Sequence, residues 1–257
     1  MSWIGKTIGG TSGLTLGGPL GDICGRAIKE FYAKSVIPKP KLKALEEKYY
    51  GKKLTEAERS FLLFFMALCA LLGKIVKAEG KVSREEVDAS LNVLLGPLKL
   101  SGSTLAFAKI VFNESKNGKK FSAKAIAEQF MEEFSQQDDT VPEFFAETLI
   151  DIAFADGELH PAEWRMILSV GKALGLDKDR LRHAALKHTS EGDKNYAVLE
   201  LEPDASDGQV RENGRKLGKV YNPNTLKRRR IPEELKKYST GQHKAVTTSS
   251  QRILKKK

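Results

Sequence analysis

The chain has 257 residues, of which 40% are hydrophobic and 30% are charged, and its formal net charge is +10. This composition describes a largely globular protein with a substantial core and room for one to three domains. Only two cysteines occur, Cys24 and Cys69, and both lie in apolar settings. The sequence therefore argues against a disulfide framework or a zinc site and favours a reducing compartment.

Glycine recurs at every fourth position near the beginning of the chain. The series consists of Gly5, Gly9, Gly13, Gly17, Gly21 and Gly25. On one helix this spacing forms a stripe without side chains, where a second helix can approach closely. The pattern is a glycine zipper, and it predicts that two copies of the chain associate as a homodimer.

Residues 1–34 are also a candidate membrane segment. No charged residue lies between Lys6 and Asp22, but the stretch is rich in Gly and Thr and contains Pro19, so it is poorly hydrophobic for a span of about 20 residues. A flexible leader on a cytoplasmic protein is the alternative. Basic residues follow at Arg26, Lys29, Lys34, Lys39, Lys41 and Lys43. By the positive-inside bias, they would place the rest of the chain in the cytoplasm.

Residues 35–54 are predicted to form a linker, and residues 55–190 a helical bundle. Pro38 and Pro40 remove helix donors and push their predecessors into extended conformations. From about residue 55 every long stretch has helical period, and residues 61–72 are apolar nearly all round, as in a central core helix. No alternating strand pattern appears, so we expect an all-α fold.

A short pattern occurs twice in this bundle, at residues 78–86 and again at residues 155–163. In each copy a glycine, Gly80 or Gly157, is predicted to take the left-handed conformation that ends a helix. The residues after it are predicted to start the next helix, through a capping box in the first copy and through His160, Pro161 and Glu163 in the second. The capping box consists of Ser83 and Glu86.

The acids of the two copies are an alternative candidate for a divalent cation site. They are Glu79, Glu86, Asp156 and Glu163. They lack the alternating ligand series of a calcium loop, so helix capping is the favoured interpretation and no cofactor is expected.

The tail from residue 195 to residue 257 contains most of the positive charge. Residues 205–257 hold fifteen Lys or Arg against four Asp or Glu, a net charge of +11, whereas the preceding residues sum to −1. A short apolar helix is predicted near residue 196, a second helix after Ser206 as N-cap, and a third long helix opened by Pro232. Basic residues recur on one face of the second helix, at Arg211, Arg215, Lys216 and Lys219. Such a surface favours an acidic partner.

Asn222, Pro223 and Asn224 form the loop after this basic helix. The tail resembles a J domain, a module that docks on Hsp70 chaperones through a basic helix and a His-Pro-Asp loop. In this chain the loop reads Asn-Pro-Asn, so both ionisable members are replaced by amides. The resemblance implies that Arg211, Arg215, Lys216 and Lys219, with the loop residues, dock on Hsp70, while stimulation of its ATPase is impaired.

Other positions of the tail also depart from the J-domain pattern. Gly214 and Gly218 stand where the family has larger residues, and each glycine costs about 1 kcal/mol in a helix interior. Ser239, His243 and Ser250 stand where the third helix is usually apolar or aromatic. We therefore expect a weakened J-like module that either docks without stimulation or is vestigial.

The repeated helix-turn-acid units resemble the TerB, or tellurite-resistance-like, domain, most specifically over residues 153–161. The order of a glycine-rich segment, a TerB-like bundle and a J domain resembles the membrane-anchored DnaJ-like co-chaperones of the DjlA type. That resemblance implies a bacterial inner-membrane protein with one N-terminal span, a cytoplasmic body, self-association through the span, and DnaK, the bacterial Hsp70, as partner.

Two alternatives remain at this stage. A TerB-like metal-binding or stress-sensor module with a vestigial tail is one. The other is a basic nucleic-acid-binding protein, suggested by residues 227–230, but interleaved aromatic residues and a reading motif are missing. No nucleophile elbow, zinc-protease pair or redox cysteine pair occurs, so we do not expect an enzyme.

Overall fold

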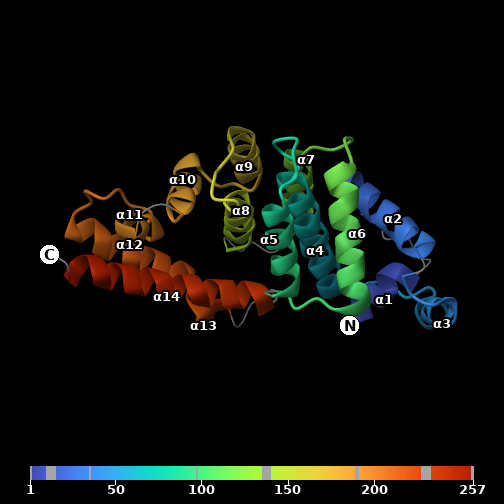
Figure 1. Ribbon diagram of the computed structural model, residues 1–257. Coiled ribbons are helices and arrows are strands. Elements are labelled where there is room, and N and C mark those ends of the chain that lie inside the picture. Colours follow the sequence, from blue (N-terminus) through green and yellow to red (C-terminus); the bar gives the residue numbers. More distant parts are fainter. Residues whose placement is uncertain are drawn as a thin grey trace.

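A computed structural model describes residues 2–9, 16–34, 36–96, 98–134, 140–188, 191–226 and 233–255 (Figure 1). Every regular element in these ranges is a helix, which confirms the all-α class. The N-terminal helices are α1 (Ser2–Gly9), α2 (Gly18–Ala33) and α3 (Lys39–Tyr49). The central helices are α4 (Glu56–Ile75), α5 (Arg84–Leu95), α6 (Gly102–Asn117), α7 (Ala123–Glu133), α8 (Thr140–Ala153), α9 (Pro161–Ala173) and α10 (Lys178–Leu186). The last helices are α11 (Glu191–Val198), α12 (Asp207–Val220), α13 (Pro223–Leu226) and α14 (Glu233–Lys255).

Helix α4 is the centre of the bundle, as its apolar sequence predicted. It begins with a capping box, in which Thr55 accepts from the Glu58 backbone and Glu58 accepts from the Thr55 backbone. Residues 62–73 are then buried without interruption, because helices α2, α6, α7 and α8 all contact α4. Gly73 lets α6 come very close, since an added Cβ would lie 2.3 Å from the Phe112 carbonyl oxygen.

The N-terminal segment forms two helices packed on this bundle. Trp3 of α1 contacts the rings of Phe61 and Phe65, at centroid distances of 5.1 and 5.0 Å. Helix α2 buries one apolar face, which includes Leu20, Ile23 and Phe31. Within the described residues, no helix combines the length and apolar character needed to cross a bilayer.

The glycines predicted to form one stripe lie on separate helices. Gly5 is in α1, where an added Cβ would lie 2.4 Å from the Tyr49 ring of α3. Gly17 is the N-cap of α2, and Gly21 and Gly25 lie within that helix. Gly9 ends α1, and Gly13 lies outside the described residues. The expectation of one continuous helical stripe from Gly5 to Gly25 is therefore wrong for the described residues.

The predicted linker is partly helical. Helix α3 begins at Lys39 and contains Pro40 in its first turn, where a missing N–H costs no helix hydrogen bond. Pro38, the N-cap of this helix, has an extended conformation with φ −53° and ψ 137°. The prediction of an extended chain through Lys41 is wrong because both prolines fall at the start of a helix.

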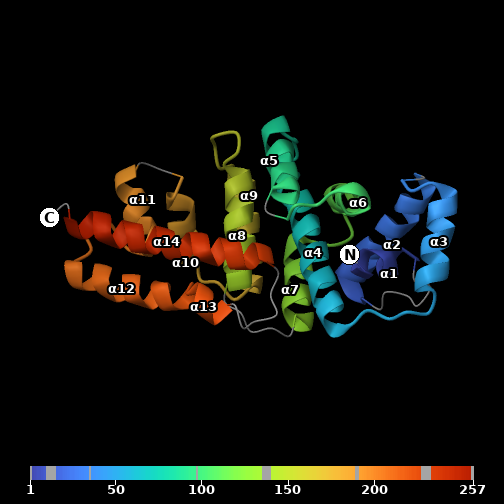
Figure 2. The ribbon, with the colours of Figure 1, turned by 90° about the horizontal axis from the view of Figure 1, so that it is seen from below.

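Helices α12 and α14 form an antiparallel hairpin (Figure 2). Gly214 faces Ser250, and Gly218 faces His243, so the paired positions run in opposite directions along the chain. An added Cβ at Gly214 would lie 2.4 Å from Ser250 Oγ, which means that this small residue permits the close approach of the two helices. Helix α11 packs beside α14.

The two ends of the molecule hold different parts of the chain. Helices α1, α2 and α3 lie at one end, and the far end of the α12–α14 hairpin lies at the other (Figures 1 and 2). Helix α8 contacts α4 at the centre of the bundle, α10, and α14 of the hairpin, which runs below α8 in Figure 1.

Candidate functional site

The predicted basic face is present and exposed on α12. This helix begins at Ser206, whose hydroxyl accepts from the Gln209 backbone while Gln209 accepts from the Ser206 backbone. Val210 and Leu217 are buried on the opposite face. All four basic side chains are exposed, namely Arg211, Arg215, Lys216 and Lys219. None of the four is in an ion pair with another described residue, so their charges are available to a partner.

The loop after α12 brings the three predicted loop residues next to the basic face. Asn222 and Pro223 are half-buried, and Asn224 is exposed. The side-chain oxygen of Asn222 accepts a hydrogen bond of 2.9 Å from the Asn224 backbone, which fixes the start of the short helix α13. Asn222 therefore has a local structural role that a short amide side chain performs well.

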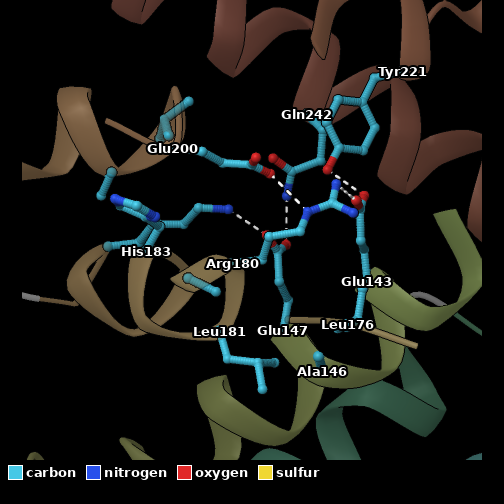
Figure 3. A pocket seen from close by; sticks show the side chains of 14 residues that line it. Glu143, Ala146, Glu147, Leu176, Arg180, Leu181, His183, Glu200, Tyr221 and Gln242 are labelled. Carbon is cyan, nitrogen blue, oxygen red and sulfur yellow. Dashed lines mark hydrogen bonds and ion pairs between the residues drawn. The ribbon is translucent and has the colours of Figure 1, made fainter. Parts of the chain in front are cut away.

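A buried polar cluster, which we call the junction, connects this loop to the bundle (Figure 3). Tyr221, the residue before the loop, donates its hydroxyl hydrogen to Glu143 of α8. Arg180 of α10 also pairs with Glu143, and its Nε lies 3.1 Å from a carboxylate oxygen of Glu200. Glu143 is only 6% exposed, so its charge depends on these partners. The junction thus joins segments that are far apart in sequence.

The electrostatics of the junction follow from this burial. Burial raises the pKa of Glu143 to about 7, although Arg180 and the Tyr221 hydroxyl act in the opposite direction. Burial and the nearby Glu143 carboxylate raise the pKa of Tyr221. Burial alone would lower the pKa of Arg180, but Glu143 and Glu200 hold it above the ordinary value. The Tyr221 hydroxyl thus stays protonated at neutral pH and can donate to Glu143 whenever that carboxyl group is ionised.

A second set of contacts ties α14 to the same face of α8. Glu147 accepts hydrogen bonds from Lys187 and from Gln242 of α14. The Tyr238 ring meets Phe144 edge to face, with a centroid distance of 5.4 Å. The sequence interpretation missed this set and the junction, yet Glu143 and Glu147 gave a signal, because they are acids within a largely apolar helix.

The two repeated turns confirm the capping predictions. Gly80 and Gly157 have φ of 93° and 97°. Ser83 and Glu86 form a capping box at the start of α5. At the start of α9, His160 Nδ1 accepts from the Ala162 backbone at 3.2 Å, and Glu163 accepts from the His160 backbone at 3.0 Å.

The repeat also brings two acids together, which the sequence interpretation did not foresee. Glu86 and Glu163 are both buried, and the two carboxyl groups lie close enough to interact. Burial and Glu86 raise the pKa of Glu163 to about 8, so the pair holds a proton at neutral pH. The two capping boxes are thereby linked to each other.

The other two candidate metal ligands do not complete a site. Asp156 accepts a hydrogen bond of 3.1 Å from the Glu158 backbone within its own turn. Glu79 lies 3.9 Å from the His160 Nε2 atom. In the part of the chain that the structure describes, no three His, Cys, Asp or Glu side chains are gathered as a metal ion requires. The basic run at residues 227–230 lies outside the described residues.

Two family models match the chain. Residues 65–186 match the model described as tellurite resistance protein TerB, and residues 1–30 match the model described as co-chaperone DjlA transmembrane domain. The first match runs from the middle of α4 to the end of α10, and the second covers α1 and most of α2.

Several curated proteins named co-chaperone protein DjlA are similar to the chain. The protein of Vibrio vulnificus strain CMCP6 is 23% identical, over 81% of this chain and 83% of its own length. The protein of Haemophilus influenzae is 28% identical, over 69% of this chain and 58% of its own length. The protein of Photobacterium profundum is 23% identical over 98% of both chains. No solved structure matches the chain significantly.

Proposed function

We propose that this chain, which is similar to DjlA co-chaperones over most of its length and to the TerB family over residues 65–186, is a membrane-anchored co-chaperone that docks on the Hsp70 chaperone DnaK. The relatives that are similar to most of this chain are named co-chaperone proteins. The proposed organisation is a membrane segment at residues 1–34, a linker at residues 35–54, a TerB-like bundle at residues 55–190 and a J-like module at residues 195–257.

The main structural support for this proposal is the antiparallel hairpin of α12 and α14. A J-like partner surface needs a basic helix and a loop that are held together. Helix α12 exposes four basic side chains, and the adjoining Asn222–Asn224 loop is anchored by Tyr221 in the junction. An acidic surface on DnaK is the complementary partner, and charge complementarity accelerates such encounters.

The two amides in the loop are the reason why we propose that the chain docks on DnaK but stimulates its ATP hydrolysis little. Asn222 cannot become a cation, and Asn224 has the shape of Asp without its charge. A hydrogen bond to a neutral group is about half as strong as one to an ionised group. Loss of one member of a desolvated charge pair costs roughly 2–5 kcal/mol. We therefore assign binding to the basic face and a loss of activation to the loop.

Matched charge removals test the docking surface. The variant R215Q/K219Q removes two charges from α12, and K237Q/K244Q removes two exposed charges from α14. We expect the α12 variant to bind DnaK about tenfold more weakly, because it loses two contacts that each contribute about 0.2–1 kcal/mol. The α14 variant should keep near-normal affinity. Equal affinity losses in both variants would contradict a specific docking face.

Membrane anchoring is supported by the match of residues 1–30 to a transmembrane family model. We propose a single span with the body in the cytoplasm, and association of the anchored chain as a homodimer. Fractionation of cells that express the full chain, followed by an alkaline wash of the membranes, tests the anchor. Release of the chain by the wash would reject it, and cross-linking in the washed membranes tests the homodimer.

The meeting of Glu86 and Glu163 gives the metal-sensing alternative its one supporting observation. That alternative requires a cation to replace the shared proton. Calorimetry of the full chain with calcium, magnesium and zinc distinguishes the two functions, because a cation response that is lost in Glu86→Gln would favour the sensor.

A further inference from the structure

A groove of about 600 Å³ lies between α3 and the start of α6. Its walls are apolar at Val36, Ile37, Pro38 and Ala44, and it is positively charged at Lys41 and Lys48. The first residues of α6 complete the lining. This groove lies far along the chain from the hairpin and takes no part in the docking surface described above.

We propose that this groove binds the phosphate headgroup of an anionic phospholipid at the membrane surface. The inference rests on the proposed membrane anchoring and adds a specific lipid contact to it. The occupant is a lipid in the bilayer that holds the chain. Free phosphate and acidic peptides are the competing ligands that the experiment separates.

The charge of α3 and the residues after it favours an anion. Between residues 39 and 53 there are six lysines and two glutamates. All six lysines are exposed, and they are Lys39, Lys41, Lys43, Lys48, Lys52 and Lys53. No acidic residue is among those that line the groove. Each lysine near an anionic bilayer contributes about 1 kcal/mol of attraction.

The mixture of apolar and cationic walls favours a lipid over a free anion. A free phosphate gains nothing from Val36, Ile37 and Pro38, whereas the glycerol and upper acyl carbons of a lipid bury apolar surface against them. The backbone at the start of α6 adds donors, because its N-cap Ser101 makes no side-chain capping bond. The lysines then hold the phosphate while the apolar walls hold the carbons.

The position of the groove agrees with this occupant. Val36 comes six residues after the end of the segment that matches the transmembrane family model. Helix α3 packs against α1, which belongs to that segment, and both lie at the end of the molecule opposite the far end of the hairpin (Figure 2). Tyr50, directly after α3, is 71% exposed, as is common for aromatic residues that lie at a bilayer interface.

Amine labelling of the full chain in nanodiscs tests the proposal. Nanodiscs of phosphatidylcholine are compared with nanodiscs that also contain phosphatidylglycerol, and lysine acetylation is followed by mass spectrometry. We expect the labelling of Lys41 and Lys48 to fall about fivefold with phosphatidylglycerol, as about 1 kcal/mol per contact implies. Lys52 and Lys53 lie outside the groove and should change far less. An equal fall at all four lysines, or none, would overturn the proposal.

Paired variants separate the groove from general attraction. Hydrogen exchange in the first turn of α6 should slow with phosphatidylglycerol in the unaltered chain and in K52Q/K53Q, but not in K41Q/K48Q. Inorganic phosphate added to phosphatidylcholine discs should slow nothing, and protection by phosphate would reject the lipid as occupant. A chain that does not stay with either disc contradicts both anchoring and the lipid site. A chain that stays with both discs without groove protection contradicts the lipid site alone.

Discussion

The bundle and the hairpin are stabilised in different ways. The bundle has one continuous apolar core, with phenylalanines at positions 64, 65, 107, 130 and 145 all buried. The hairpin has a small core of its own, which consists of Leu199, Val210, Leu217, Tyr221, Val246 and Ile253. At one close contact between the hairpin helices, the facing residues are Gly214 and Ser250 rather than large apolar side chains.

This difference shows that the hairpin depends on the bundle. Tyr238 packs against the bundle core and against the hairpin core, and Tyr221 reaches Glu143 of the bundle. The loop that is proposed to meet DnaK is therefore held in place from outside the J-like module. A core substitution in the bundle should affect the whole molecule, whereas a change at the junction should affect mainly the hairpin.

The largest effect is expected from the centre of the bundle. Phe65→Ala removes a buried ring that stacks on Phe107, and we expect the free energy of unfolding to fall by about 3–5 kcal/mol. Urea unfolding followed by circular dichroism measures it. A loss below about 1 kcal/mol would contradict the central position of this ring.

A smaller and more local effect is expected at the junction. Tyr221→Phe leaves the buried Glu143 without its hydroxyl donor, which costs about 1–3 kcal/mol. Hydrogen exchange should accelerate in residues 221–226 and in α14, while α4 stays protected. Tyr196→Phe, on the same small core, is the matched control and should leave the loop unchanged. Uniform acceleration through the bundle would show that the two regions unfold together.

The acid pair of the repeat predicts a dependence on pH within the bundle. The pKa of Glu163 is raised from 4.5 to about 8, so the folded chain binds a proton that the unfolded chain releases. This contribution to stability is full below pH 4.5 and is lost as the pH rises to 8. We expect lower thermal stability at pH 9 than at pH 5.5, and a flatter profile in Glu163→Gln. An unchanged profile in that variant would reject the shared proton.

The smallest effect is expected from removing equivalent helix N-caps in the bundle and in the hairpin. Ser83→Ala in the bundle and Ser206→Ala in the hairpin each remove one side-chain cap, at a cost of about 1 kcal/mol. Because the hairpin core is small, we expect local hydrogen exchange to rise in α12 after Ser206→Ala, but little in α5 after Ser83→Ala. Equal local responses would mean that the hairpin is as independent as the bundle.

Local sequence signals predicted much of this fold. The caps at Ser83, His160 and Ser206, and the left-handed Gly80 and Gly157, follow from rules that involve residues only a few positions apart. The same rules did not reveal that Glu86 and Glu163 of the two repeated turns interact, because these residues are far apart in the sequence.

The junction escaped prediction for the same reason. Glu143, Arg180, Glu200 and Tyr221 come from α8, α10, the segment after α11 and the end of α12, and only tertiary packing brings them together. The errors at α3 and along the glycine series were different, because proline and glycine were interpreted without knowing where each helix begins.

The central claim is that the hairpin binds DnaK while its amide loop fails to activate it. Single-turnover ATP hydrolysis by DnaK, with binding measured on the same samples, tests this claim most directly. The account predicts that the unaltered chain binds without accelerating hydrolysis and that Asn222→His with Asn224→Asp restores acceleration. Acceleration by the unaltered chain equal to that of the double variant would contradict it.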